Sequence, residues 1–355
     1  MDVGLIGLPG SGKTTVFNLL TGAGAETSAF GGGRVEARQA LAAVPDPRLE
    51  VLAGMFHPRK VTYAQLRVVD VPGLSRGETG GPNRFLNEVR AVDALVHVIR
   101  GFPNALGEPP QPVADAVDME LELGLADLDL LERRRERLDQ QRKLTAEGRL
   151  ERDVVERLIA ALEAGRRIEQ VALDEAEARL LRGYQFLTQK PMVWVVNLTE
   201  AAFEAGTWPG RAELEERAAS LGIPLVVTAG QWEMEAMALD PEERRAFLQA
   251  LGLEETGISR LARAVYRRLG LISFLTAGED EVRAWTVAAG TTAKAAAGKI
   301  HSDIERGFIR AEVVAFEDLR EAGSLARARE RGLVRMEGRD YVVQDGDVIT
   351  FRFNV

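Results

Sequence analysis

The chain has 355 residues, of which 46% are hydrophobic and 28% are charged, a composition typical of a globular protein with ample core material. Its formal net charge of −9 argues against non-specific binding to nucleic acid, and we expect no DNA partner. The absence of cysteine excludes disulfides and thiolate metal sites. Since neither a long apolar run nor an export signal is found, we expect a cytoplasmic location and no membrane partner.

Short apolar segments alternate with helical patterns along much of the chain. Five of these segments predict strands, at residues 3–8, 66–70, 94–99, 192–197 and 225–228, and helical patterns follow, as at 14–20 and 82–92. Strands that alternate with helices indicate a parallel, doubly wound α/β sheet. Ligands of such sheets bind at the carboxyl ends of the strands, so the loops after these segments are the candidate sites.

The first loop, "GLPGSGKTT", follows the first predicted strand and opens a helix. Its spacing is that of a P-loop, in which small residues let backbone N–H groups reach phosphate oxygens while the lysine reaches the outer phosphates. The hydroxyl after the lysine binds Mg²⁺ in such loops. The predicted nucleotide-binding residues here are Gly7, Gly10, Ser11, Gly12, Lys13, Thr14 and Thr15, with Thr14 also a metal ligand.

The stretch "LRVVDVPGL" ends a predicted strand at Asp70 and has Gly73 three residues later. This D-x-x-G spacing is the arrangement of switch-type nucleotide hydrolases, where the acid holds the Mg²⁺ shell and the glycine N–H senses the γ-phosphate. We therefore predict Asp70 as a second metal ligand and Gly73 as a nucleotide-binding residue.

Residues 112–190 are rich in Leu, Glu and Arg and interrupt the alternation of strands and helices. Apolar residues recur there at three- and four-residue spacing, among them Leu121, Leu125, Leu128 and Leu131. We interpret this region as an inserted helical hairpin, a short antiparallel coiled coil, although a helix pair that only packs on the sheet would show the same pattern.

The stretch "VWVVNLTE" ends a predicted strand at Asn197 and resembles an altered guanine motif. GTPases have Asn-Lys-x-Asp here, whereas this chain has Leu198 in place of the lysine and Glu200 in place of the aspartate. Discrimination based on that acid should be lost, which favours adenine or a relaxed site; an ordinary helix start without base contact is the alternative. Ala229, in "TAG" after the next strand, is a further predicted base contact.

Residues 274–355 consist of short strands separated by Gly and Asp turns, with a helical piece near 317–323. This predicts a small α+β domain of β-grasp character. The predicted organisation is therefore a P-loop domain at 1–111 and 191–273, a helical insertion at 112–190 and the C-terminal domain at 274–355.

With these features together, nearly the whole chain resembles the YchF (Obg-like ATPase) family. The most specific passages are "VPDPRL", "NRFLNEVRAVDALVHVIR", "ELGLADLDLLERR", "VRAWTV", "AAGKIHSDIERGFIRAEV" and "DYVVQDGDVITFRFNV", of which the last three are similar to the TGS domain that ends these proteins. The resemblance implies a P-loop ATPase of the translation-factor class that uses Mg²⁺ and prefers ATP, binding GTP more weakly. It also implies a ribosomal or other translation partner, with RNA contacts through the helical and TGS-like domains.

The resemblance implies functional roles for several residues of this chain. Adenine contacts fall on Asn197 and Leu198, and Leu74 occupies the place of the catalytic glutamine, so that no catalytic residue is assigned and unaided hydrolysis should be slow. The chain departs from the family at Gly10, where the family has asparagine, and in "AFGGGRVEA", where no hydroxyl follows Phe30 to complete the Mg²⁺ shell.

Two other functions are compatible with the same motifs. A degenerate member that binds nucleotide with little or no turnover is favoured by Leu74 and the glycines at 31–33. A small-molecule kinase is suggested by the "PGSG" filling of the P-loop. The kinase would need a basic lid, however, and the insertion at 112–190 has 14 basic against 18 acidic residues, a net charge of −4.

Overall fold

A computed structural model of the chain describes residues 1–22, 38–70, 89–250, 253 and 255–354. These residues form two compact units, one made of 1–40 and 67–261, the other of 41–66 and 262–355. None of the helices in the described ranges is both long and apolar enough to cross a membrane.

The first unit contains a sheet in the strand order β2-β4-β1-β5-β6-β7. The strands are β1 (Asp2–Ile6), β2 (Arg38–Val44), β4 (Ala64–Asp70), β5 (Ala94–Gly101), β6 (Met192–Leu198) and β7 (Leu225–Thr228). The pairs β4–β1, β1–β5, β5–β6 and β6–β7 are all parallel, so their carboxyl ends meet at one edge. Continuous apolar runs make the central strands; all seven residues of β6 are buried.

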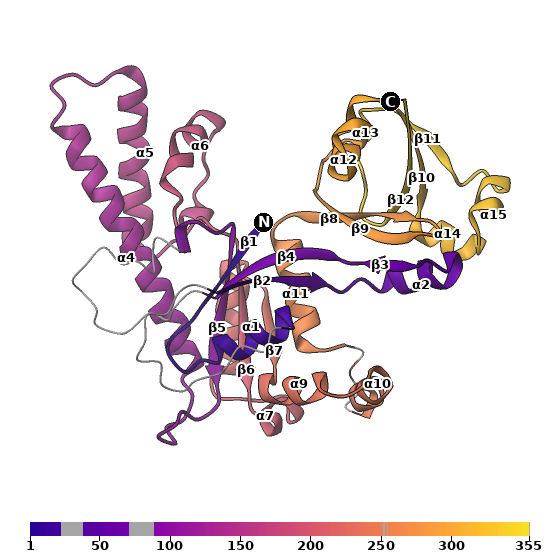
Figure 1. Ribbon diagram of the computed structural model, residues 1–355. Coiled ribbons are helices and arrows are strands. Elements are labelled where there is room, and N and C mark those ends of the chain that lie inside the picture. The colour runs from indigo at the N-terminus through magenta and orange to yellow at the C-terminus, as the bar shows by residue number, and fades with distance from the viewer. Residues whose placement is uncertain (23–37, 71–88, 251–252, 254, 355) are drawn as a thin grey trace. The chain divides into compact units, whose positions relative to one another are not determined.

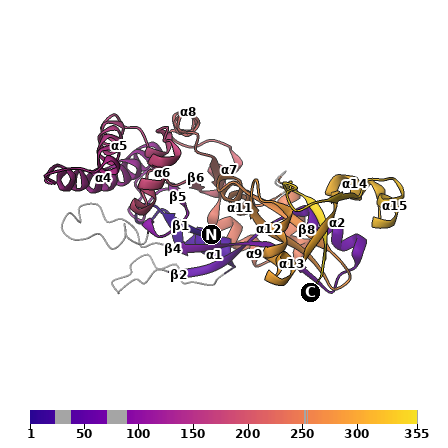
Figure 2. The same cartoon turned by 90° about the horizontal axis from the view of Figure 1, so that it is seen from above.

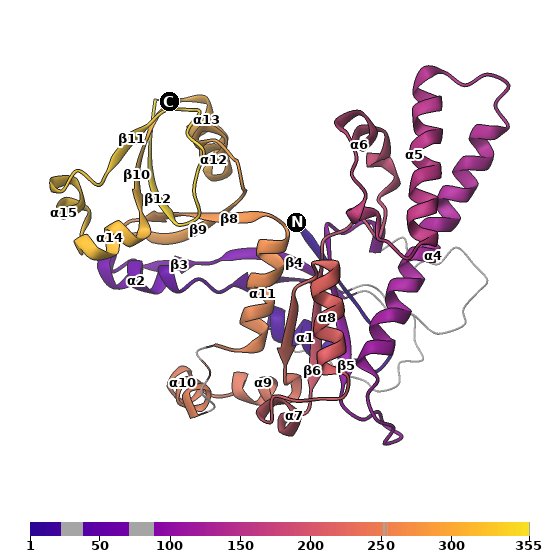
Figure 3. The same ribbon diagram turned by 180° about the vertical axis from the view of Figure 1, so that it is seen from behind.

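Helices lie between the strands of this sheet and after the last of them, and α11 continues into the second unit. They are α1 (Lys13–Thr21), α7 (Glu200–Glu204), α8 (Arg211–Leu221), α9 (Gly230–Met237), α10 (Pro241–Ala250) and α11 (Gly257–Arg268). Leu214 and Ala218 of α8 belong to the same buried cluster as Trp194 and Val196 of β6, and α8 lies over these strands in Figure 3. The doubly wound α/β fold is thereby confirmed.

A helical hairpin is inserted between β5 and β6. It consists of α4 (Pro112–Asp139) and α5 (Ala146–Glu163), followed by the short elements η1 (Ile168–Gln170), α6 (Glu175–Leu181) and η2 (Arg182–Tyr184). Figures 1 and 2 show α4 and α5 side by side with α6 next to them. Thr145 caps α5 by accepting a hydrogen bond from the backbone N–H of Gly148, which places the turn after residue 139.

The buried face of α4 differs from the predicted one. Leu121 and Leu125 are 58% and 51% exposed, whereas Met119 and Leu123 are fully buried against the sheet. Leu131 is buried as predicted, in a second cluster with α5. The sequence carries two apolar stripes on this helix, and the prediction followed the wrong one over its first half.

The second unit contains a sheet in the order β11-β10-β12-β8-β9-β3. Its strands are β3 (Lys60–Thr62), β8 (Leu271–Ala277), β9 (Glu281–Ala288), β10 (Phe308–Ala315), β11 (Arg335–Glu337) and β12 (Asp347–Phe353). Its helices are α2 (Pro47–Phe56), α12 (Ala293–Ile300), α13 (Ser302–Arg306), α14 (Phe316–Ala322) and α15 (Leu325–Glu330). Apolar residues of α12 pack on β8, β9, β10 and β12, which gives the predicted α+β unit its core.

Residues 41–66 were expected in the nucleotide-binding domain but belong to the second unit. The reason is that β3 pairs in parallel with β9 and that α2 contacts β8 and β9. Thr62 adds a side-chain hydrogen bond of 2.5 Å to Glu281. The second unit also begins at residue 262, before the predicted boundary at 273.

Candidate nucleotide-binding site

The predicted P-loop connects β1 to α1 in a shape that only small residues permit. Gly12 has φ 90°, and a Cβ there would overlap the side-chain amide of Asn197. At Gly7, a Cβ would lie 2.5 Å from the carbonyl oxygen of Val98. The hydroxyl of Ser11 is buried in the loop without a hydrogen-bond partner among the described residues. A backbone cradle with an unsatisfied polar atom fits an anionic ligand such as a chain of phosphates.

Lys13 begins α1 and turns back over the loop. Its Nζ donates a hydrogen bond of 3.2 Å to the carbonyl oxygen of Gly7. Burial lowers the pKa of Lys13, and the nearby Asp70 carboxylate acts in the opposite direction. This cation is held close to the cradle, at the position from which a P-loop lysine binds phosphate oxygens.

The two predicted metal ligands are brought together by the pairing of β1 with β4. Asp70 is the last residue of β4 and pairs in register with Leu5 of β1, directly before the loop. Its side chain is hydrogen-bonded to Thr14 on the first turn of α1. Thr15 is the next residue of that turn. Burial raises the pKa of Asp70, while the charges of Lys13 and Arg38 and the Thr14 bond oppose the rise. A hydroxyl and a carboxylate are the hard oxygen ligands that Mg²⁺ prefers.

Asn197 joins the P-loop to the loop that follows β7. Its Nδ2 donates to the carbonyl oxygen of Ser11 at 3.4 Å, and its Oδ1 accepts from the N–H of Gly230 at 2.9 Å. Ala229, between Thr228 and Gly230, is 1% exposed. Three loops at the ends of β1, β6 and β7 therefore form one connected edge, where the sequence predicted phosphate and base contacts.

The other two residues of the altered guanine motif, Leu198 and Glu200, differ in their exposure to solvent. Leu198 is 3% exposed and belongs to the hydrophobic core, packed against Gly101, so its backbone and not its side chain remains for a ligand. Glu200 is exposed at the start of α7. Gly73, Leu74 and the stretch 29–37, which the sequence also indicated, lie outside the described residues.

Two residues that the sequence reasoning missed support this edge. Glu233 accepts hydrogen bonds from the Thr228 hydroxyl (2.6 Å) and from the backbone N–H groups of Gly257 and Ile258 (3.0 and 3.1 Å). It thereby fixes the loop after β7 to the start of α11. The only signal for it was an acid in the first turn of α9, which is too common to single out.

His97 is the second missed residue. It is 1% exposed on β5, and neither ring nitrogen has a partner in the described part of the chain. Burial lowers the pKa of His97 to about 3, with a smaller contribution from the charge of Lys13. The imidazole behind the loop is therefore neutral. It makes an edge-on packing contact with Trp194, with ring centroids 6.4 Å apart.

The chain is similar to known proteins over nearly its full length. A model described as 50S ribosome-binding GTPase matches residues 2–123, and the YchF-type GTPase C-terminal model, described as a protein of unknown function, matches residues 271–354. The "Ribosome-binding ATPase YchF" of Haemophilus ducreyi is 41% identical over 99% of both chains, and that of Bacillus subtilis is 39% identical over the full length of both. The chain belongs to the YchF family.

Further relatives extend the likeness beyond bacteria. The "Obg-like ATPase 1" of Caenorhabditis elegans is 35% identical over all of this chain and 92% of its own length. The solved structure of the Schizosaccharomyces pombe YchF GTPase superposes with a TM-score of 0.86 at 27% identity and covers 99% of this chain and 97% of its own. The predicted family and fold class are both confirmed by these matches.

At Gly10 the resemblance to the YchF family implies asparagine, and the structure describes this residue. It has φ 75°, the left-handed region that glycine and asparagine tolerate best, and no atom lies within 4 Å of the position a Cβ would take. The exchange of asparagine for glycine therefore keeps the shape of the loop and removes only one side-chain amide from the cradle.

Proposed function

We propose that this chain binds ATP with Mg²⁺, hydrolyses it slowly in preference to GTP, and acts with the ribosome. The observation that carries the proposal is the connected edge at the ends of β1, β4, β6 and β7, where Lys13, the Asp70–Thr14 pair and Asn197 converge. The names of the relatives support both the ATPase activity and the ribosomal partner. A ribosomal partner also supports a cytoplasmic location.

The preference for adenine rests on Asn197 and its neighbours. Both ends of the Asn197 side-chain amide are used within the protein, and Leu198 is in the core. Guanine recognition requires a well-placed acid for the N1 and N2 hydrogens, and a site built for such a bond rejects a base that lacks it. Here Glu200 replaces the shorter aspartate on an exposed helix start. Without that acid placed for guanine, the site loses its means of excluding adenine.

The chemistry at this edge is mainly electrostatic. In hydrolysis the oxygen of a water molecule bonds to the γ-phosphorus, the bond from that phosphorus to the β–γ bridging oxygen breaks, and the proton of the water leaves to solvent or phosphate. Lys13 and the backbone N–H groups of the loop stabilise the charge on the phosphate oxygens. A bound Mg²⁺, held through Thr14 and Asp70, would neutralise further charge. With Leu74 in the place of the glutamine that orients water, slow turnover follows.

Nucleotide affinity tests the proposal directly. Isothermal titration with ATP and with GTP, each with and without Mg²⁺, is expected to show tighter binding of ATP and a gain in affinity when Mg²⁺ is present. A tenfold preference for GTP would overturn the interpretation of Asn197–Glu200. If binding is tight but phosphate release with ribosomes stays at the background level, the chain is the degenerate nucleotide-binding module instead.

We further propose that the chain works as three parts, a P-loop domain, the helical insertion at 112–190 and a TGS-like domain, with residues 41–66 and 262–273 counted with the last as in the second unit. The helical and TGS-like parts are the proposed contacts to the ribosome and its RNA, without a DNA or membrane partner. An exposed apolar stripe on α4 supports the role of the hairpin: Val117, Leu121 and Leu125 are 37%, 58% and 51% exposed at helical spacing. Such contiguous exposed apolar surface commonly marks a contact surface.

Substitution of this stripe tests the ribosome contact. The double variant Leu121→Glu/Leu125→Glu is expected to reduce co-sedimentation with ribosomes at least about tenfold, because two apolar side chains are removed from the contact surface and two charges must be desolvated. ATP turnover without ribosomes should not change. The control Ala212→Glu/Ala219→Glu adds the same charge to exposed positions of α8. Equal co-sedimentation of both variants would exclude the stripe as the contact.

A further inference from the structure

The second unit contains a cavity of about 620 Å³ that the proposed ATPase function does not use. Three segments distant in sequence line it: residues 44–51 before and within α2, residues 263–273 from α11 to β8, and part of α14 with Asp345. All of these residues belong to the second unit. Its volume lies in the range of about 300–1,000 Å³ that is typical of small-molecule sites.

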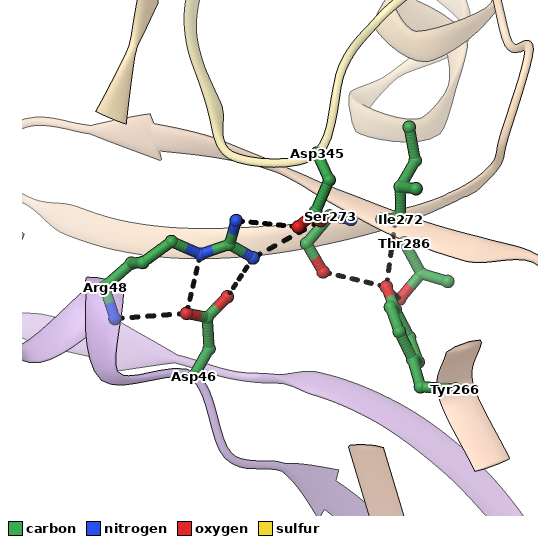
Figure 4. A network of polar contacts seen from close by, with 7 residues as sticks. All are labelled: Asp46, Arg48, Tyr266, Ile272, Ser273, Thr286 and Asp345. Atoms are coloured by element: carbon green, nitrogen blue, oxygen red, sulfur yellow. Dashed lines mark hydrogen bonds and ion pairs between the residues drawn. The ribbon is translucent and has the colours of Figure 1, made fainter. Parts of the chain in front are cut away.

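The floor of the cavity is a rigid polar network (Figure 4). The guanidinium of Arg48 donates to both oxygens of Asp46 (2.8 Å each) and of Asp345 (2.9 and 3.3 Å). Burial acts to lower the pKa of Arg48, but the bonds to these two carboxylates raise it above its ordinary value. Asp345 also accepts from the backbone N–H of Ser273, whose hydroxyl is 2.8 Å from that of Tyr266. These groups satisfy one another and fix the shape of the cavity.

The remaining charge of the cavity is carried by arginines of two helices. Arg263 and Arg267 are four residues apart on α11 and so share one face. Arg267 is exposed, and its side chain makes no ion pair or hydrogen bond within the described part of the chain. Arg320 of α14 pairs with Glu317 at 2.5 Å, but both side chains are more than half exposed, so this pair is weak. Since Arg48 is already matched by two carboxylates, the cationic groups open to a ligand are those of Arg267 and Arg320.

Apolar side chains also line the cavity. Val44, Pro45, Pro47 and Val51 line it from the segment around α2, and Leu271 and Phe316 from the rest of the unit. A site lined by both arginines and apolar side chains fits a ligand with an anionic group on an apolar or flat body. An inorganic ion alone would leave most of this volume unfilled.

We propose that this cavity binds a phosphorylated small molecule of the size of a nucleoside monophosphate. The phosphate lies at Arg267 and Arg320, and the body of the ligand lies against Pro47, Val51 and Phe316. Guanidinium groups bind phosphate through paired, charge-assisted hydrogen bonds, and arginines from two helices are suited to the two charges of a phosphate monoester. The site is separate from the P-loop and does not depend on the proposed ATPase function.

The test uses the full chain with the substitution Lys13→Ala, which weakens phosphate binding at the P-loop. AMP, GMP, CMP and UMP are titrated by calorimetry, with adenosine and inorganic phosphate as the two halves of the ligand. At least one monophosphate is expected to bind, and both halves are expected to bind more weakly. Addition of Arg267→Ala/Arg320→Ala should lower the affinity at least about tenfold, the usual effect of losing charge-assisted hydrogen bonds.

Arg327→Ala is the matched control, because Arg327 is exposed on α15 of the same unit and does not line the cavity. Its affinity should equal that of the Lys13→Ala parent. Lack of binding by all four monophosphates at millimolar concentration would overturn the proposal. It would also fall if Arg267→Ala/Arg320→Ala bound as tightly as the control. Since Arg267 and Arg320 are exposed, loss of folding is not expected to obscure the result.

Discussion

Replacement of Lys13 by alanine is expected to reduce ATP turnover at least about 100-fold, the scale found when one preorganised charge-stabilising donor is removed from an active site. Lys13 is the half-buried cation of the cradle; its Nζ is held 3.2 Å from the Gly7 carbonyl oxygen, so it is positioned before a ligand arrives. The alanine variant keeps the backbone N–H groups, and ATP affinity should therefore fall but not vanish. Phosphate release and calorimetric titration with ATP and Mg²⁺ measure both effects.

Lys143→Ala provides the matched control, because Lys143 is an exposed lysine at the turn of the helical hairpin. It removes the same charge without touching the cradle, and turnover should stay at the level of the unchanged chain. Circular dichroism of the Lys13→Ala variant should show an intact fold, since the hydrogen bond from Nζ to the Gly7 carbonyl oxygen joins residues only six positions apart in the chain. Undiminished turnover in that variant would mean that hydrolysis does not take place at this loop.

The phosphate-binding end of the site could be predicted from the sequence because its signals are local. The spacing from Gly7 to Thr14 determines a loop between a strand and a helix, and the structure has α1 beginning at Lys13. Asp70 and Asn197 were predicted at strand ends, and parallel pairing then brings such ends to one edge. The convergence needed no knowledge of distant side chains, only of the sheet type.

The features that were missed depend on contacts between distant parts of the chain. Residues 41–66 have no local signal for their partner, since β3 pairs with β9 more than 200 residues later. The hydrogen bond that the Asn197 side chain accepts from Gly230 could not be predicted from "NLTE" either. Helical periodicity alone cannot decide which of two apolar stripes on one helix is buried.

On α4, the buried stripe contains a residue that looks unsuitable for a core. The buried stripe runs through Met119, Leu123 and Leu131, with Asp127 between them at 0% exposure. A buried carboxylate is tolerated only when it is paired and hydrogen-bonded, and the partners of Asp127 are 37 and about 60 residues away. A prediction from periodicity therefore preferred the stripe without the charge, which contains Leu121 and Leu125.

Replacement of Asp127 by alanine is expected to loosen the attachment of the hairpin to the sheet. Asp127 accepts hydrogen bonds from the backbone N–H groups of Leu187 (3.0 Å) and Thr188 (2.8 Å), from the Thr188 hydroxyl (2.9 Å) and from Arg90 (3.0 Å). Removal of one partner of a buried ion pair leaves the other charge uncompensated and costs about 3–5 kcal/mol. The side chain of Arg90 is 14% exposed, so water can relieve only part of that cost.

The readout that separates this network from general destabilisation is amide hydrogen exchange. In the Asp127→Ala variant the amides of Leu187 and Thr188 should lose protection before those of β6, because they lose their acceptor directly. Asp129→Ala is the control on the same helix; Asp129 is exposed and pairs only with Arg133 one turn away among the described residues, an interaction of about 0.3–0.5 kcal/mol. Unchanged protection of Leu187 and Thr188 in Asp127→Ala would show that packing of Met119 and Leu123 alone holds α4 on the sheet.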